Sequence, residues 1–208
     1  MLLRPGVMVS SSSLPNGEWK STTSGILVVD EQGTPFITVS TQGFNVDGEV
    51  WHPDPSGFLI GKVVRTIPDA NISLIQLANG TRYINQCVTS SEPGVSVQSG
   101  LISGYPPHLK HYDRVTMKSP SDSVEGLVLA QGIKIKVSRK IVEHQWLYMN
   151  LDTDLADRAH GSPILADDNR TIVGFLRQGQ KDPKHYYTVS AAALWDAGYE
   201  IRGHEVEF

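Results

Sequence analysis

Short apolar runs separated by turn-forming residues recur along almost the whole chain. Residues 25–29 and 35–39 flank a turn at 31–33, which is the pattern of a β-hairpin. Further runs follow at intervals of about 8–12 residues, at 61–65, 72–77, 95–103, 113–117, 126–131, 133–137, 146–151 and 171–176. This density of short strands predicts an all-β protein built as a sandwich or as barrels, not an α/β fold.

Three other segments carry local signals. Residues 190–197 are the one stretch that predicts a helix, with Ser190 suited to cap its start and Gly198 its end. Asn79-Gly80 lies between two apolar runs, where it predicts a type I′ hairpin turn. Residues 1–19, which include four consecutive serines, predict a loosely held arm that packs across the second half of the protein.

Composition narrows the classes of function. The chain has 208 residues, of which 39% are hydrophobic and 19% charged, as in a globular protein with a core. No apolar run reaches the roughly 18 residues that a membrane span needs, and a net charge of −4 argues against nucleic-acid binding. The basic run at 134–140 alternates with apolar residues and is typical of a strand's solvent face, with an anion site as the alternative.

Cysteine and histidine usage bears on the compartment and on cofactors. Cys87 is the only cysteine, so no intramolecular disulfide forms, and residues 1–6 do not have the pattern of a secretory signal; both favour a reducing, cytoplasmic setting. His108 and His111 have no Cys or acidic partner that completes a metal-ligand set. There is no glycine-rich phosphate loop. We therefore expect neither a metal nor a cofactor.

One segment carries a resemblance to a known family. Residues 157–164, Asp-Arg-Ala-His-Gly-Ser-Pro-Ile, resemble the nucleophile loop G-[DN]-S-G-[GS]-P of chymotrypsin/trypsin-like serine peptidases, with His160 at the position of the nucleophilic serine. The resemblance implies that the backbone N–H groups of Arg158 and His160 line an oxyanion hole. It also implies that Asp154 lies at the floor of the specificity pocket and that Arg177 borders it. The alternative for Asp154 is a place in an exposed acidic loop, and the alternative for Arg177 is a strand position that faces solvent.

Two further segments extend this resemblance in the order base, acid, nucleophile. Residues 36–44 resemble the strand that normally ends in T-A-A-H or T-V-A-x-H-G, and the two registers place either Thr41 or Gln42 at the general-base position. Residues 70–77 resemble the strand D-I-A-L-[IV]-x-L that supplies the orienting aspartate, here replaced by Asn71, with Asp69 two residues upstream. Neither Thr nor Gln titrates near neutral pH.

The resemblance implies a fold and a division of the chain. We expect a double antiparallel β-barrel of chymotrypsin-like type, each barrel with six strands, closed by a short C-terminal helix. Residues 1–19 would form the N-terminal arm, 20–94 the first barrel, and 95–208 the second barrel with the helix.

The same resemblance predicts what function is lost. A serine hydroxyl needs an adjacent base, and the base needs a carboxylate, so replacement of all three predicts a degenerate member, a pseudoprotease. Its former substrate cleft would bind a peptide or partner protein. Alternatively, the cleft binds a small molecule on which a repurposed enzyme acts, with His160 as the acid/base group or hydrogen-bond donor. His160 as a relic that makes only a local hydrogen bond is the third interpretation.

Overall fold

The computed structural model describes residues 2–12, 17–42, 44–67, 70–88, 99–102, 109–120, 123–132, 134–137, 140–143, 146–151, 157–166, 171–180, 185–202 and 206–207. Within these ranges the protein consists almost entirely of strands, with one 3₁₀ helix and one α-helix. None of the helices among the described residues has the length and apolarity that crossing a membrane requires. The expected all-β class is therefore confirmed.

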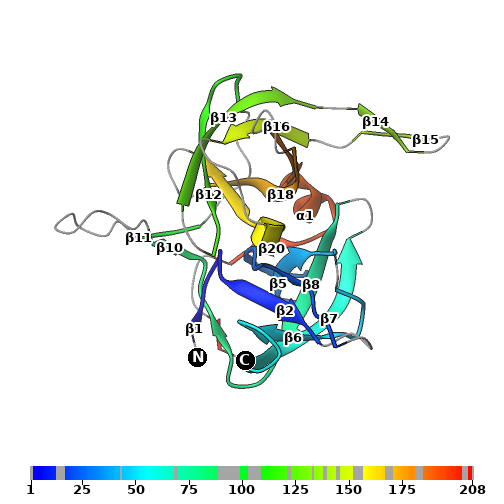
Figure 1. Ribbon diagram of the computed structural model, residues 1–208, viewed down its shortest axis with the longest axis vertical. Coiled ribbons are helices and arrows are strands. Elements are labelled where there is room, and N and C mark those ends of the chain that lie inside the picture. The colour runs from blue at the N-terminus through cyan, green and yellow to red at the C-terminus, as the bar shows by residue number, and fades with distance from the viewer. Residues whose placement is uncertain are drawn as a thin grey trace.

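The first half of the chain builds a strongly curved antiparallel sheet. Among the described residues its order is β20 (Glu200–Ile201), β4 (Leu27–Val29), β5 (Pro35–Ser40), β8 (Ile72–Leu77), β7 (Phe58–Ile67), β6 (Glu49–His52), β2 (Met8–Ser11) and β3 (Ser21–Thr23). It occupies the lower part of the molecule in Figure 1. Strand β3 lies at one edge, and the C-terminal strand β20 lies at the other.

The second half closes into an antiparallel barrel. Its strands follow the order β12 (Arg114–Lys118), β13 (Ser123–Gln131), β16 (Trp146–Leu151), β19 (His185–Ser190), β18 (Ile172–Gln180) and β17 (Pro163–Ala166). The 3₁₀ helix η1 (Asp157–Ala159) lies between this barrel and the sheet below it. This is the double-barrel architecture that the resemblance implies, and the second barrel has the expected six strands. The expectation of six strands is wrong for the first half, which is an open half-barrel of eight strands among the described residues, because β2 from the N-terminal segment and β20 from the C-terminal segment join it.

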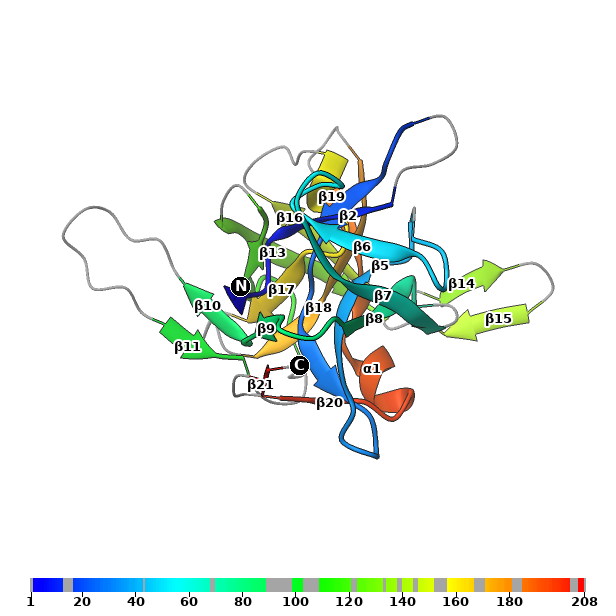
Figure 2. The ribbon, with the colours of Figure 1, turned by 90° about the horizontal axis from the view of Figure 1, so that it is seen from below.

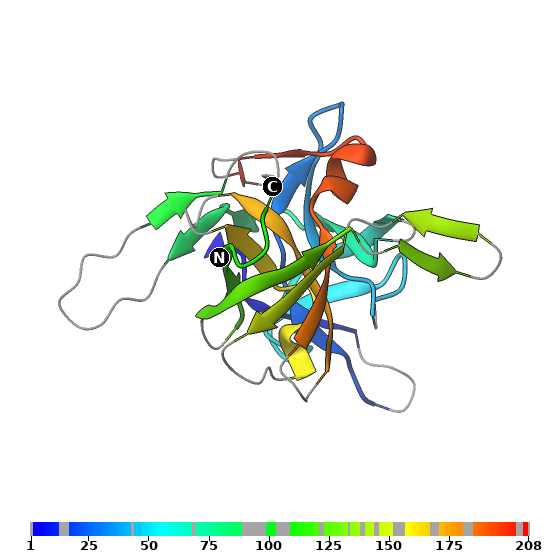
Figure 3. The same ribbon diagram turned by 90° about the horizontal axis from the view of Figure 1, so that it is seen from above.

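Small sheets and ribbons complete the described fold. β1 (Leu2–Leu3) pairs in parallel with β9 (Arg82–Tyr83), which also pairs with β21 (Val206–Glu207). Two ribbons, β10 (Gln86–Val88) with β11 (Ser99–Leu101) and β14 (Lys134–Val137) with β15 (Lys140–Glu143), extend from opposite sides of the body (Figures 2 and 3).

The two halves share a core, because one apolar cluster draws residues from both. Val28, Phe36 and Leu74 of the sheet belong to the same buried cluster as Phe175 of the barrel and Leu194 of α1 (Ala192–Asp196). Each half also has an apolar cluster of its own. Because apolar burial is the dominant favourable term in folding, the shared cluster fixes how the halves meet.

The N-terminal segment differs from the expected loose arm. Met8–Ser11 forms β2, which pairs with β3 on one side and with β6 on the other. Val9 is fully buried in the core of the sheet. The segment is therefore part of the first sheet, and it also contacts the second half, because a Cβ atom at Gly6 would lie 3.2 Å from the Cβ of Lys118 in β12. The boundaries 1–19, 20–94 and 95–208 themselves stay predictions.

The predicted hairpin at Asn79-Gly80 is wrong. Gly80 has φ +80°, but Asn79 is not among the residues of positive φ, and the Thr81 N–H donates to the Ala78 carbonyl at 3.1 Å. One positive φ at the third position is typical of a type II turn, whereas type I′ needs two. The chain therefore leaves β8 in a new direction, and β9 pairs with β1 and β21.

The C-terminal helix is shorter than expected. It spans Ala192–Asp196, and Ala191 is its N-cap residue, without a side-chain cap bond. The Ser190 hydroxyl, one residue before this N-cap, accepts the Ala192 N–H at 3.2 Å. Gly198 follows the helix with φ +84°, as expected of a residue that ends one.

Candidate functional site

The loop that resembles a nucleophile loop is attached to the edge of the first sheet. The His160 carbonyl accepts the Thr23 N–H at 2.9 Å and also accepts the Thr22 hydroxyl. The Arg158 carbonyl accepts the Thr23 hydroxyl at 2.9 Å. Because these bonds run from β3 to the turn at η1, the loop is a junction between the two halves of the protein.

Gly161 brings this loop into direct contact with the strand that resembles the base-bearing segment. It has φ +81°, and a Cβ atom there would lie 2.9 Å from the Ser40 nitrogen and 2.7 Å from the Thr23 oxygen. Its N–H donates to the Leu176 carbonyl at 2.9 Å. Only glycine combines this backbone conformation with so close an approach.

Among the described residues, one hydrogen bond holds the His160 ring. Its Nδ1 lies 2.5 Å from the carbonyl oxygen of Arg177, which stands where the pairing of β18 with β19 shifts register between Leu176 and Gln178. A bulge changes the direction of the backbone groups beside it, and here the Arg177 carbonyl accepts a hydrogen bond from the His160 ring. Since a carbonyl only accepts, Nδ1 carries the hydrogen, and Nε2 is left as the other polar atom of the ring.

The residues at the predicted base and acid positions lie next to each other. The Thr41 N–H donates to the Asn71 carbonyl at 3.0 Å, and the Thr41 hydroxyl accepts from Ser73 at 3.1 Å. The Asn71 side-chain amide donates to the Ser40 hydroxyl at 3.1 Å. Asn71 has φ +54°, a left-handed conformation that Asn adopts more readily than most residues.

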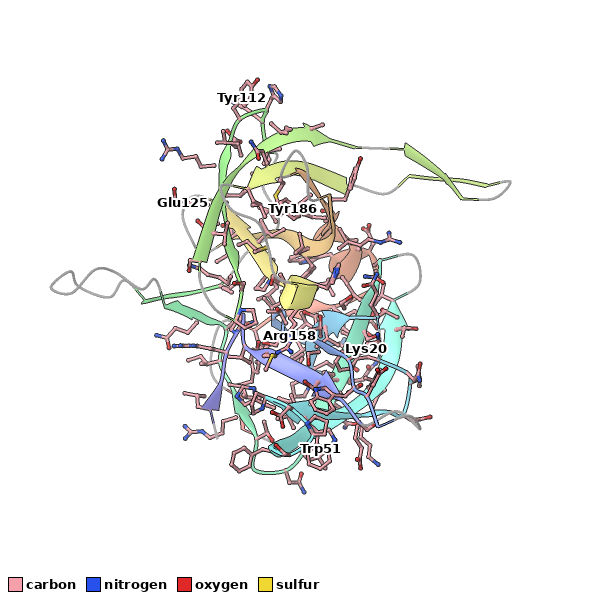
Figure 4. The ribbon with its side chains drawn as sticks, in the orientation of Figure 1. Lys20, Trp51, Tyr112, Glu125, Arg158 and Tyr186 are labelled. Atoms are coloured by element: carbon pink, nitrogen blue, oxygen red, sulfur yellow. The ribbon has the colours of Figure 1, made fainter. Side chains whose placement is uncertain are left out.

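An open cleft of about 700 Å³ lies where β3 meets the loop. Its walls are Gly17, Glu18, Trp19, Lys20, Ser21, Thr22, Gln42, Arg158 and His160, and these residues define the cleft below. Gln42 and His160 therefore face the same space, whereas Thr41 is not part of its wall. Arg158 and Lys20 are labelled in Figure 4, Arg158 at the level of η1 and Lys20 beside the sheet.

Ser162 is a hydroxyl in the loop, two residues after His160. It is fully buried, and its Oγ has no hydrogen-bond partner among the described residues. It is absent from the wall of the cleft. A nucleophile must be within reach of a base and of the substrate, so Ser162 is not arranged as one.

The remaining predicted site residues are only partly located. Arg158 is exposed and lies in the 3₁₀ helix η1, two residues before His160. The oxyanion role of Arg158 and His160 stays a prediction. Arg177 is half-buried and contributes its carbonyl to His160. Asp154, Asp69 and His108 lie outside the described residues, so their predicted roles stay open.

One wall of the cleft is not predicted by the sequence. Trp19, Lys20 and Ser21 lie in the predicted arm and at the start of the predicted first barrel, and the sequence pattern gives them no role in a site. The signal that could have found them is Trp19 in an otherwise polar stretch. In the folded protein its side chain is 47% exposed, which is unusual for so large an apolar group.

Comparison with known proteins finds similarity in structure. No protein-family model and no curated protein matches the chain by sequence. Among solved structures, Thermobifida fusca protease A has a TM-score of 0.70 at 10% identity, covering 98% of this chain and 100% of that one. The Nocardiopsis protease has a TM-score of 0.68 at 10% identity, with 97% and 100% covered.

A third neighbour gives the same result. The chymotrypsin of Cellulomonas bogoriensis has a TM-score of 0.65 at 11% identity, and the alignment covers 98% of this chain and 100% of that one. At such identities the likeness concerns the fold alone. The fold of this chain is that of chymotrypsin/trypsin-like serine proteases, as the three sequence segments imply.

Proposed function

We propose that this protein binds an extended peptide segment, free or as part of a partner protein, in the cleft, and that it does not hydrolyse it. The observation that carries the proposal is the backbone edge of β3 at Ser21, which borders the cleft and with which no described residue pairs; we call it the free edge of β3. In the pairing of β2 with β3, the Ser11 N–H donates to the Lys20 carbonyl and the Ser24 N–H to the Val7 carbonyl. In an antiparallel pair, bonding alternates along the strand, so the N–H and C=O of Ser21 face away from β2.

The neighbouring residue on the same side supports this orientation. The Thr23 N–H, two residues after Ser21, donates to the His160 carbonyl, so this side of β3 faces the loop. No described residue pairs with the backbone of Ser21 on that side. An unpaired strand edge is a template for an added strand, which is a common mode of peptide recognition.

The chemistry available in the cleft argues against triad hydrolysis. The segments that resemble the base, acid and nucleophile segments carry Thr41 or Gln42, Asn71 and His160. None of these combinations provides a hydroxyl or thiol nucleophile activated by a base and oriented by a carboxylate. The cleft is also open and mostly polar, with Trp19 as the one aromatic residue among its walls, unlike the enclosed apolar pockets that hold small molecules.

Replacing Ser21 with proline tests the added strand. Proline removes the backbone N–H that faces the cleft and is tolerated at an edge, so the fold should persist. The probe is a pool of acetylated nonapeptides in which Thr and Val alternate with randomised positions. We expect the immobilised Ser21→Pro variant to retain this pool about 10-fold less strongly than the immobilised unmodified protein does. Mass spectrometry measures the retention and should recover the peptides intact.

Ser21→Ala is the matched control. It removes the hydroxyl, which bonds to Ser10 at 2.8 Å, but keeps the backbone N–H. Its retention of the pool should stay within about 2-fold of the unmodified protein, because the backbone N–H that would pair with an added strand is unchanged. Equal losses in both variants, or no retention of the pool at all, would overturn the proposed function, and cleaved peptides would overturn its non-hydrolytic part.

A second function is favoured by the orientation of His160. A ring whose Nδ1–H is anchored to a carbonyl leaves Nε2 as a base, an arrangement suited to acid/base catalysis on a small molecule. The proposed binding function instead predicts that His160→Ala and His160→Gln retain the peptide pool within about 3-fold, since neither change alters the β3 edge.

The two His160 variants separate these functions. Glutamine can still donate an amide N–H to the Arg177 carbonyl, but it cannot take up a proton. Incubation of the protein with a mixture of cellular small molecules, followed by mass spectrometry, should give no product that depends on His160. A product made by the unmodified protein and reduced about 100-fold in both variants would support the repurposed enzyme.

A further inference from the structure

Among the described residues, the wall of the cleft carries more positive than negative charge, although the whole chain has a net charge of −4. Of these wall residues, Lys20 and Arg158 are the two fixed cations, and Glu18 is the one carboxylate. Such a local excess, opposite in sign to the protein as a whole, raises the local concentration of anionic ligands and disfavours cationic ones.

Both cationic side chains are available to a ligand. Arg158 is exposed, and among the described residues its guanidinium has one partner, the Met8 sulfur at 3.6 Å, which is a weak acceptor. Lys20 is exposed, and no described carboxylate pairs with its ammonium group. Exposed cations on many proteins are available in the same way. For Lys20 and Arg158 the availability matters because of where the backbones of these two residues are held.

The backbones of both residues are fixed beside the free edge of β3. The Lys20 N–H donates to the Ser11 hydroxyl at 3.0 Å, and its carbonyl accepts the Ser11 N–H at 2.8 Å. The Arg158 carbonyl accepts the Thr23 hydroxyl. Lys20 directly precedes Ser21, and Arg158 belongs to the turn that covers the next part of the same edge. A strand added at Ser21 would therefore run past both cations.

We infer that the peptide bound in the cleft is acidic, with Asp or Glu side chains that pair with Lys20 and Arg158. This inference rests on the proposed function, because it requires a strand at Ser21. Arg158 presents the planar fork that suits a carboxylate, and Lys20 acts as a compact charge. Trp19, 47% exposed in the same wall, offers an apolar surface to a neighbouring side chain of the peptide.

Two matched pools test this charge preference. Both have the Thr/Val frame used above, but in one pool three alternate positions carry Glu, and in the other the same positions carry Gln. We expect the Glu pool to be retained about 3- to 10-fold more strongly, as two exposed ion pairs allow. The difference should disappear when salt rises from about 50 mM to about 500 mM, because screening weakens exposed pairs.

Charge reversal assigns the preference to the cleft. The double variant Lys20→Glu with Arg158→Glu should lose the preference for the Glu pool, and it should keep its thermal stability because both backbones hold their bonds. Lys110→Glu with Arg114→Glu is the control, since it changes the net charge equally at two exposed residues. These flank Tyr112, which Figure 4 labels at the far end of the second barrel. The control should keep the preference.

The outcomes separate the two proposals. Equal retention of both pools, sensitive to Ser21→Pro, would leave peptide binding standing and overturn the acidic preference. A preference that the control variant also loses would assign it to overall charge, and this too would overturn the inference. Retention of neither pool would overturn both. A single-stranded oligothymidylate tests the other anionic partner. If it displaced the Glu pool and bound more tightly than that pool does, the partner would be a nucleic acid, and the peptide assignment would be overturned.

Discussion

Replacing Gly161 with alanine is expected to lower the free energy of unfolding by about 3–5 kcal/mol. Two effects add. The residue has φ +81°, and an alanine Cβ would lie 2.7 Å from the Thr23 oxygen and 2.9 Å from the Ser40 nitrogen. Both are backbone atoms held in strands, so they cannot rotate away as the end of a flexible side chain does. The loop and the first sheet must separate to accept the methyl group.

Gly80→Ala is the control that isolates the contact from the strain. Gly80 has φ +80°, nearly the same as Gly161, yet nothing lies within 4 Å of the position of its Cβ atom. It should lose only about 1 kcal/mol, the usual penalty for alanine in the left-handed region. Denaturant unfolding of the two variants, with unchanged m-values, gives the comparison. Equal losses would mean that the approach of the loop to Thr23 and Ser40 contributes nothing.

The same substitution also bears on function. The His160 carbonyl bonds to Thr23, and the Gly161 nitrogen bonds to Leu176, so displacement of Gly161 shifts the loop that forms one wall of the cleft. Peptide retention should therefore fall together with stability in Gly161→Ala, whereas Gly80→Ala should retain peptides normally. The junction of the two halves and the cleft are one structural feature.

The sequence predicted the fold better than it predicted the cleft. The density of short strands is a local pattern that predicts the all-β class, and the resemblance of the segments at 36–44, 70–77 and 157–164 to a known family implies the double barrel. The hairpin at Asn79-Gly80 failed because the dipeptide allows more than one turn type, and here tertiary pairing of β9 with β1 and β21 determines the direction of the chain.

The parts of the site that were missed depend on contacts distant in sequence. The partner of the His160 ring is the Arg177 carbonyl, which lies at a bulge, and periodicity does not reveal a bulge. The wall from Gly17 to Thr22 becomes part of the cleft because β3 pairs with a segment that the sequence presents as a serine-rich arm. A single sequence does not specify which edge strand stays uncovered, since that is set by the sheet order.

Removal of the Asn85 side chain is the second change expected to have a large effect. Asn85 is fully buried; its Oδ1 accepts the Leu27 N–H at 2.7 Å, and its Nδ2 donates to the Leu27 carbonyl at 2.7 Å and to the Arg202 carbonyl at 2.6 Å. One side chain thus joins β4 to the chain just after β20. Asn85→Ala should cost about 3–4 kcal/mol, since it removes three bonds and leaves the buried Leu27 N–H without this acceptor.

Asn85→Asp gives this loss a signature that a packing defect would not have. Aspartate keeps the acceptor toward the Leu27 N–H but loses both donors, and its charge then faces the Leu27 and Arg202 carbonyls. Burial raises the pKa of such a carboxyl, so its neutral form, which can donate once, dominates at low pH. The variant is therefore closest to the unmodified protein below the carboxyl's unfolded pKa, and the deficit grows as pH rises through the folded pKa.

The measurement is denaturant unfolding at several pH values between about 4 and 7, with each variant compared with the unmodified protein at the same pH. Gln76→Ala is the control, because it removes an amide from an exposed position on β8 and should change stability by less than about 0.5 kcal/mol. A small loss in Asn85→Ala, or a pH-independent deficit in Asn85→Asp, would mean that the three bonds do not hold the C-terminal segment. A large loss with the expected pH dependence would show that one buried amide joins the end of the chain to the first sheet, on the side opposite the free edge at β3.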